Sequence, residues 1–170
     1  MDDGLHIYEN PVGVLTNNPP FDYHLHNLNN YLNLTPKEPE NRFSEKVSLR
    51  PYSFGMGAIG LPGDLSSASR FVRAAFVLNN SASTDAESSR ISQFFHILES
   101  VAQPRGCNQI GDSCEITMYS SCCNTDKGIY YYKTYENSQI TGINLLHEDL
   151  DSNNLKAYHL VTEQQIRFKN

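Results

Sequence analysis

The sequence lacks the features that identify a membrane-spanning or nucleic-acid-binding protein. Its longest apolar runs, such as residues 72–78, are far shorter than the roughly 20 residues that a spanning helix needs. Its 13 lysines and arginines are outnumbered by 19 aspartates and glutamates, and they form no dense basic patch for a phosphate backbone. We therefore expect no membrane-spanning segment, no membrane partner and no nucleic acid partner.

Motifs for cofactors, paired thiols and export are missing too. The sequence contains no Gly-x-Ser-x-Gly, no phosphate-binding loop and no dinucleotide fingerprint, so no cofactor is expected. The four cysteines, at positions 107, 114, 122 and 123, form no paired Cys-x-x-Cys knuckles. The first residues have neither the basic nor the apolar segment of a secretory signal. These absences predict a cytoplasmic protein with free thiols and no metal site.

The chain does contain enough apolar material for a folded core. Its 170 residues are 39% hydrophobic and 19% charged, which is not the composition of a disordered protein. From length alone, one domain with a single core is expected.

The first 32 residues predict two strands and a helix. Short apolar runs at residues 5–8 and 12–15 indicate strands with a bend between them. An amphipathic helix should follow, because apolar residues recur at spacings of four, three and four. These residues are Phe21, Leu25, Leu28 and Leu32.

A long loop and a second helix come next. Residues 33–62 contain prolines and glycines without periodicity, which predicts a loop that binds something or reaches another subunit. Asp64 or Ser66 should cap the helix that follows. Its apolar stripe consists of Phe71, Ala74, Ala75 and Leu78.

The remaining residues predict a third helix and an antiparallel meander. Thr84 and Glu87 have the spacing of a capping box. The helix after them should bury Ile91, Phe94, Phe95, Leu98 and Val101. Strands are expected within residues 116–123, 129–135 and 139–145, and the tail near Tyr158 could hold a last short strand. This order predicts an α+β fold with helices packed on an antiparallel sheet.

Histidines, cysteines and tyrosines suggest structural roles before chemical ones. His24 and His26 lie on different faces of the predicted helix, so a solvated face is favoured over a shared zinc site. Cys122 and Cys123 point to opposite faces of a strand without a nearby His or Arg, which favours core thiols over catalysis. Residues 130–132, three consecutive tyrosines, favour packing over ligand stacking.

Two residues have features that could serve catalysis. Asn17 ends a predicted strand, where its amide could donate a hydrogen bond to an oxyanion, although spacing alone favours a simple turn. Arg70 lies in the first turns of a helix, where a cation opposes the helix dipole and therefore needs a local partner.

Longer motifs occur in a fixed order along the chain. They are residues 8–19 (YENPVGVLTNNP), 55–57 (GMG), 60–67 (GLPGDLSS), 69–71 (SRF), 119–124 (YSSCCN), 128–132 (GIYYY), Tyr135 and 137–140 (NSQI). Together they closely resemble the choloylglycine hydrolase family over essentially the whole chain. Within that family, the chain is more similar to the bile salt hydrolases than to the penicillin V acylases.

The resemblance implies an N-terminal nucleophile hydrolase with a four-layer αββα sandwich, which cleaves the linear amide between a bile acid and glycine or taurine. In this family a cysteine exposed by removal of the initiator Met is the nucleophile, and its α-amine is the base. By motif, Asn17 corresponds to the oxyanion donor and Arg70 to the arginine beside the nucleophilic sulfur. The loop at residues 103–112 would border the substrate pocket. Residues 33–63 resemble the segment that grips a neighbouring subunit in a homotetramer.

The sequence also departs from the family. Residue 2 is Asp2 instead of Cys, and the family's early Arg and Asp have no counterpart before Asn17. Residues 1–170 are therefore expected to form the C-terminal portion of a single, truncated choloylglycine hydrolase domain. Because all four cysteines are internal, we expect no activity from this chain alone.

The resemblance leaves three functions open. The first is the hydrolysis of conjugated bile acids by a homo-oligomer, once the missing half is supplied. A penicillin V acylase-type amidase and a non-catalytic truncated remnant are the alternatives.

Overall fold

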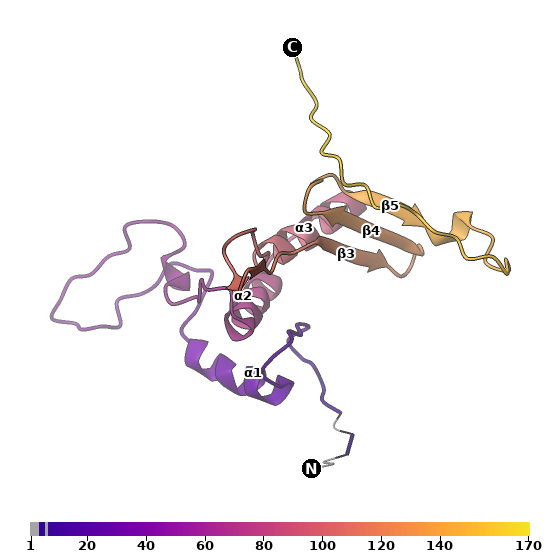
Figure 1. The fold of residues 1–170 in the computed structure, drawn as a ribbon. Helices are drawn as coiled ribbons and strands as arrows, with labels where there is room; N and C mark the ends of the chain where they lie inside the picture. The colour runs from indigo at the N-terminus through magenta and orange to yellow at the C-terminus, as the bar shows by residue number, and fades with distance from the viewer. Residues whose placement is uncertain (1–3, 6) are drawn as a thin grey trace. The chain divides into compact units, whose positions relative to one another are not determined.

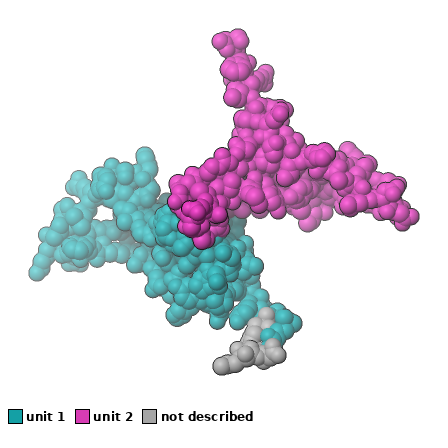
Figure 2. All heavy atoms as spheres, viewed as in Figure 1, with its two compact units in different colours: residues 1–85 teal, residues 86–170 magenta. Residues whose placement is uncertain are grey.

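The computed structural model describes residues 4–5 and 7–170 of the chain. The chain divides into two compact units, residues 1–85 and residues 86–170, which Figure 2 draws in teal and magenta. The ribbon in Figure 1 shows helices in both units and the larger sheet in the second. Each unit is described by itself below.

The first unit is built on helices. An aromatic cluster joins the helices α1 (Phe21–Asn27) and α2 (Ser67–Asn80). The centre of the Phe71 ring lies 4.6 Å from that of His24, in a stacked arrangement, and 6.2 Å from that of Phe21, in an edge-on arrangement. The predicted helix at residues 21–32 is confirmed in its first two turns, but its end tightens into a 3-10 turn and leaves Leu32 80% exposed. The unit also contains the 3-10 helices η1 (Leu28–Tyr31) and η2 (Met56–Ala58).

The cap of α2 is one of the two that the sequence predicts. Ser66 is the N-cap, and its side chain accepts a hydrogen bond from the backbone N–H of Ser69 at 3.4 Å. The apolar stripe is confirmed for three of its four predicted members, which are buried, and Leu78 is half-buried. The buried members are Phe71, Ala74 and Ala75.

The two strands predicted near the start are wrong within the described residues. Residues 4–5 and 7–15 form no strand, and His6 lies outside the described part. Asn10 instead organises a turn, because its Oδ1 accepts from the N–H of Gly13 at 2.9 Å and its Nδ2 donates to the carbonyl of Val14 at 3.0 Å. A strand needs a hydrogen-bonded neighbour, and no described strand pairs with this segment.

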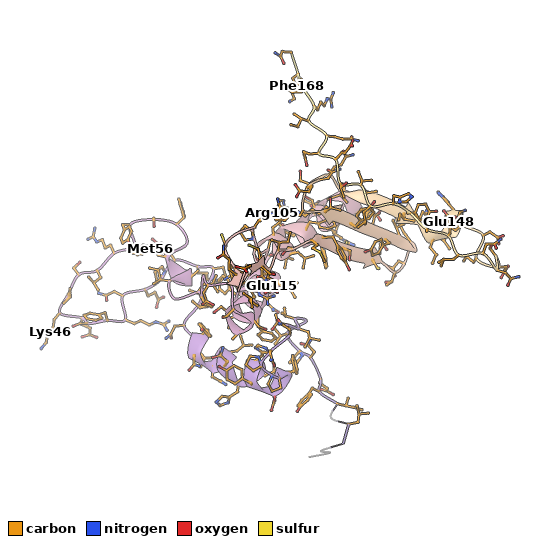
Figure 3. The ribbon with its side chains drawn as sticks, viewed as in Figure 1. Lys46, Met56, Arg105, Glu115, Glu148 and Phe168 are labelled. Atoms are coloured by element: carbon orange, nitrogen blue, oxygen red, sulfur yellow. The ribbon has the colours of Figure 1, made fainter. Side chains whose placement is uncertain are left out.

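The predicted loop at residues 33–62 is confirmed, with η2 as its one helical turn among the described residues. Figure 3 shows Lys46 at the outer end of this loop and Met56 near its base. The base is closed by the N–H of Thr35, which donates to the carbonyl of Gly57 at 3.0 Å. Only a glycine fits there, because a Cβ on Gly57 would lie 2.1 Å from the carbonyl oxygen of Lys37.

The second unit carries the predicted antiparallel meander. Its three strands pair in the order β3-β4-β5, with Ser121 opposite Tyr132 and Tyr131 opposite Gly142. A small hairpin, β1 with β2, occupies residues for which a loop is predicted. The elements are α3 (Glu87–Glu99), β1 (Gln109–Ile110), β2 (Ser113–Cys114), β3 (Tyr119–Asn124), β4 (Ile129–Thr134), β5 (Thr141–Asn144) and η3 (Leu145–His147).

The tyrosines of β4 pack as expected. Tyr132 is buried, and its ring stacks on Tyr130 at 6.1 Å. Tyr131 lies against Gly142, where an added Cβ would come within 3.1 Å of the ring.

The capping box predicted for α3 is wrong. Ala86 is the N-cap and makes no side-chain cap bond, so Glu87 is the first helical residue. The carboxylate of Glu87 instead accepts from Nδ2 of Asn124 at 2.7 Å and from Nζ of Lys127. Contacts to β3 and the turn after it therefore decide where the helix begins.

The far end of α3 is tied to the sheet as well. Phe95 is the buried apolar residue of the helix, and Nζ of Lys133 lies 5.4 Å from the centre of its ring. The same Nζ donates to Glu99. Ile91 and Leu98 are only half-buried, Phe94 is exposed and Val101 lies beyond the end of the helix, so the predicted buried stripe is confirmed at Phe95 alone.

The tail forms no strand, so the possible last strand is not found. Side chains hold it instead: Oγ1 of Thr134 donates to the carbonyl of Val161, and Nδ2 of the buried Asn137 donates to the carbonyl of Glu163, both at 2.9 Å.

None of the helices in residues 4–5 and 7–170 is both long and apolar enough to cross a membrane. The α+β class is confirmed, since α3 packs on an antiparallel sheet.

Candidate active site

The structure brings Asn17 and Arg70 together. Nη2 of Arg70 donates to Oδ1 of Asn17 at 2.9 Å, although the residues are 53 positions apart in the chain. Asn17 is exposed and Arg70 is half-buried. A carboxamide has one oxygen and one NH2 group, so an oxygen held on the guanidinium turns Nδ2 of Asn17 away from it. The NH2 group is therefore directed toward other acceptors.

Both neighbours of Asn17 are held in place. The hydroxyl of Thr16 lies 3.1 Å from Nε2 of His24, and the N–H of Asn18 donates to Oγ of Ser67 at 3.1 Å. These contacts attach the Asn17 segment to α1 on one side and to the start of α2 on the other.

His24 corrects the expectation of a solvated helix face. It is completely buried, and its ring stacks on Phe71 with an interplanar angle of 13°. Burial lowers the pKa of His24, because a charged imidazole would lose its hydration there. The missed signal is its spacing, since His24 lies three residues after Phe21 and four before Leu28 on the apolar side of α1.

A turn before α2 holds Arg70 from the other side. Nε of Arg70 donates to the carbonyl of Leu65 at 3.1 Å. The carboxylate of Asp64 accepts from the N–H of Ser66 at 3.0 Å and from the hydroxyl of Ser69 at 2.5 Å. The hydrogen bonds from the hydroxyls of Ser66 and then Ser69 lower the pKa of Asp64 to about 2.

Arg73 closes the same turn. Its Nη1 donates to the carbonyls of Pro62 at 2.7 Å and Asp64 at 3.1 Å, and burial lowers its pKa. The sequence predicts Asp64 only as a possible helix cap, and its patterns assign no role to Ser69 or Arg73. Helical spacing is the signal that could have found Ser69 and Arg73, because Ser66, Ser69 and Arg73 recur at intervals of three and four on one face.

The cysteines do not form a reactive or a core cluster. Cys123 is exposed and Cys122 is half-buried, so the prediction that these two are core thiols is wrong; Cys107 and Cys114 are exposed as well. Burial raises the pKa of Cys122, which disfavours its thiolate. Within the described part of the chain, no group of three or more metal-ligating side chains lies together.

The loop expected to border a substrate pocket is a braced structure of the second unit. The side chain of the buried Gln103 accepts from Nδ2 of Asn108 at 2.6 Å and donates to Glu115 at 3.3 Å. Glu115 and Arg105 are labelled in Figure 3. The hairpin that this network supports leaves Ile110 exposed.

Comparison with known proteins shows what the chain resembles. Residues 1–158 match the model of the linear amide C–N hydrolases, choloylglycine hydrolase family. The chain is 60% identical over 164 residues to the bile salt hydrolase/transferase of Lactiplantibacillus plantarum, which covers 96% of this chain and 51% of the relative. It is 44% identical over 156 residues to the bile salt hydrolase/transferase of Clostridium perfringens, covering 91% and 47%.

Solved structures agree. A crystal structure of a conjugated bile acid hydrolase variant from Clostridium perfringens matches with a TM-score of 0.83 and 41% identity, over 97% of this chain and 50% of that chain. The penicillin V acylase from Agrobacterium tumefaciens shares the fold, with a TM-score of 0.54 and 22% identity over 78% of this chain and 35% of that one. The chain spans about half the length of the curated relatives that it matches. On this agreement between motifs, sequence and fold, the chain belongs to the choloylglycine hydrolase family of linear amide C–N hydrolases.

Proposed function

We propose that this chain supplies the oxyanion donor and an arginine to a hydrolase that cleaves the amide bond of glycine- or taurine-conjugated bile acids. The hydrogen bond from Arg70 to Asn17 is the observation that carries the proposal. The relatives named as bile salt hydrolases support the choice of substrate.

Asn17 and Arg70 have complementary roles in this proposal. When a nucleophile attacks an amide carbonyl, negative charge develops on the oxygen, and a preorganised N–H donor stabilises it. Arg70 holds Oδ1 of Asn17, so Nδ2 is the atom left to donate to that oxygen. The guanidinium also places a permanent positive charge beside the reacting atoms, where a thiolate or an oxyanion would benefit.

The nucleophile of the proposed reaction is not among these residues. The family mechanism uses one cysteine whose own α-amine acts as the base, and each cysteine of this sequence is internal. We therefore expect residues 1–170 to act as the C-terminal portion of a single domain and to release no glycine from glycocholate by themselves.

A chimera tests the proposal. The matched half of the Lactiplantibacillus plantarum relative is replaced by this chain, and glycine and taurine release from conjugated cholates is measured. Turnover of conjugated bile acids is expected, and loss of that turnover in Asn17→Ala should follow. A folded chimera that hydrolyses penicillin V in preference to glycocholate would contradict the substrate class, and one with neither activity would contradict the function.

We also propose that the loop at residues 33–63 joins copies of the full protein into a homo-oligomer. Three aromatic side chains on it, Phe43, Tyr52 and Phe54, are exposed, as expected of a surface that a neighbouring subunit covers. Light scattering of the chimera should give a mass above that of one chain, and a monomer at all concentrations would contradict this assignment. The cytoplasmic location stays a prediction, which cell fractionation can test.

A further inference from the structure

We propose that Asp64 is a positioning residue for Arg70, and that it acts through the backbone carbonyl of Leu65. The proposal deepens the proposed function and rests on it for its effect on turnover, but not for its effect on the orientation of Arg70.

The direction of the Arg70 side chain depends on two hydrogen bonds. Its Nε donates to the carbonyl of Leu65 at 3.1 Å, and its Nη2 donates to Asn17 at 2.9 Å. The guanidinium is planar and rigid, so fixing Nε also fixes where Nη2 can reach. The carbonyl of Leu65 therefore determines whether the guanidinium meets the amide oxygen of Asn17.

That carbonyl lies outside any helix or strand, so its position depends on the turn around it. The carboxylate of Asp64 spans the turn, with one oxygen on the N–H of Ser66 and the other on the hydroxyl of Ser69. Ser66 is the N-cap of α2 and Ser69 lies in its first turn, so both anchors belong to the start of the helix that also carries Arg70. Asp64 thus holds the Leu65 carbonyl against the first turn of the helix.

Arg73 fixes the other end of the turn. Its Nη1 bridges the carbonyls of Pro62 and Asp64, at 2.7 and 3.1 Å. Arg73 lies one helical turn after Arg70, so both arginines donate to the same short stretch of backbone. Asp64 binds from a side chain within the turn, whereas Arg70 and Arg73 bind the turn from the helix.

The charge of Asp64 suits this role. Its pKa of about 2 keeps the carboxylate ionised throughout the neutral range, and an ionised acceptor makes shorter and stronger hydrogen bonds than a neutral one. The bond to Ser69 shows this, at 2.5 Å.

The first experiment observes the orientation of Arg70 in the full chain. The exchange rate of the Arg70 Nε proton with solvent is measured by NMR in the unaltered chain and in Asp64→Ala, Asp64→Asn and Ser69→Ala. We expect about tenfold faster exchange in Asp64→Ala, since the hydrogen bond to Leu65 is lost, with smaller increases in the other two variants. Asp149→Ala is the matched control, because Asp149 accepts from the N–H of Asp151 in a turn of the same kind in the other unit.

The second experiment measures turnover in the chimera that carries the same substitutions. A misdirected Arg70 should lower kcat by about tenfold to 10²-fold in Asp64→Ala, with KM nearly unchanged and with partial rescue in Asp64→Asn. Equal exchange rates in the unaltered chain, Asp64→Ala and Ser69→Ala would overturn the proposal, whatever the activity. Faster exchange in Asp64→Ala, found together with a parent chimera that has no turnover, would support the positioning role and contradict the proposed function instead. If Asp64→Ala does not fold, the milder Ser69→Ala decides in the same way.

Discussion

At the scale of single residues, the orientation of one amide group determines what this site can do. Oδ1 of Asn17 accepts from Arg70, so the NH2 group is the part that remains for a substrate oxygen. An arginine paired with an asparagine in this way makes a hydrogen-bond donor out of a side chain that could equally have been an acceptor.

Asn17→Asp separates this chemistry from the structural contact. The aspartate keeps an oxygen on Arg70, and gains a charge-assisted bond, but it has no N–H to donate to an oxyanion. In the chimera we expect kcat for glycocholate to fall by about 10² to 10³-fold, while the melting temperature stays equal or rises. Asn153→Asp makes the same chemical change at an exposed position and serves as the control. Retention of kcat in Asn17→Asp would show that Nδ2 of Asn17 is not the donor.

Asp64 gives a prediction about pH. The hydroxyls of Ser66 and Ser69 lower its pKa from 3.8 to about 2, so the folded chain releases this proton more readily than the unfolded chain does. The resulting stabilisation is present above about pH 4 and is lost as the pH falls through about 2. In thermal melts we expect the chain to be more stable than Asp64→Asn at pH 6, and the difference should close between about pH 4 and 2.

The same melts contain an internal check. Ser69→Ala removes one of the hydroxyls that lower the pKa of Asp64, so its stability should vary less steeply over that pH range. A difference between the chain and Asp64→Asn that persists unchanged at pH 2 would contradict the assignment.

At the scale of secondary-structure elements, α3 is joined to its sheet by a carboxylate at each end. Glu87 meets Lys127 and Glu99 meets Lys133, but the two lysines differ in exposure. The side chain of Lys133 is 12% exposed and lies over the ring of Phe95, whereas that of Lys127 is 58% exposed. The buried stem of Lys133 therefore contributes packing as well as charge.

Lys133→Ala should consequently destabilise the chain more than Lys127→Ala. We expect about 1 kcal/mol for Lys133→Ala from lost packing and lost attraction to the aromatic ring, or a melting temperature lower by about 2–4 °C. Lys127→Ala should produce a smaller shift, and one that disappears at high salt. Equal shifts in melting temperature for the two variants would mean that the contact between Lys133 and Phe95 does not stabilise the chain.

The base of the 33–63 loop depends on a glycine. A Cβ on Gly57 would lie 2.1 Å from the carbonyl oxygen of Lys37 and 2.5 Å from that of Thr35, and backbone atoms cannot easily move aside. Gly57→Ala should therefore cost about 1–3 kcal/mol and open the loop, so that trypsin cleaves after Lys46 about tenfold faster. Gly63→Ala is the control, because its Cβ would meet nothing within 4 Å. Unchanged cleavage in Gly57→Ala would contradict the closed base.

The elements that the sequence predicts well are those defined by local periodicity. The stripe of α2 follows from repeating apolar positions, and the meander of β3 to β5 follows from runs of strand-forming residues separated by turns; both are present. The start of α3 could not be predicted from spacing, because the N-cap is Ala86 instead of Thr84, and Glu87 accepts from Lys127, 40 positions away. The missing strands near Val14 show the same limit, since a strand requires a partner that local sequence does not specify.

The candidate site was predictable only in part for a similar reason. Asn17 and Arg70 follow from family motifs, but the turn around Asp64 depends on how the chain folds back onto α2. The burial of His24 could not be predicted from the helix alone, because a buried polar side chain needs a hydrogen-bond partner. That partner is Thr16, which lies in the segment before the helix.

At the scale of the whole molecule, large apolar side chains remain exposed in both units. Leu15 and Leu32 are exposed in the first unit. In the second, Leu155 is 96% exposed, and Phe168, near the outer end of the tail in Figure 3, is 78% exposed. A groove of about 1060 Å³ also opens between the end of the sheet and residues 145–158. Because the chain spans about half the length of its curated relatives, we infer that the other half of such a protein would cover part of this surface.

This inference gives a prediction about binding. When the unmatched half of the Lactiplantibacillus plantarum relative is added as a separate polypeptide, it should associate with this chain and reduce the fluorescence of a dye that binds exposed apolar surface. It should also raise the melting temperature of the chain in a concentration-dependent way, since a ligand that binds only the folded state stabilises it by mass action. An unrelated polypeptide of equal length is the control. A dye signal and a melting temperature that respond equally to both polypeptides would mean that the exposed side chains are not a surface for the other half of the family's fold.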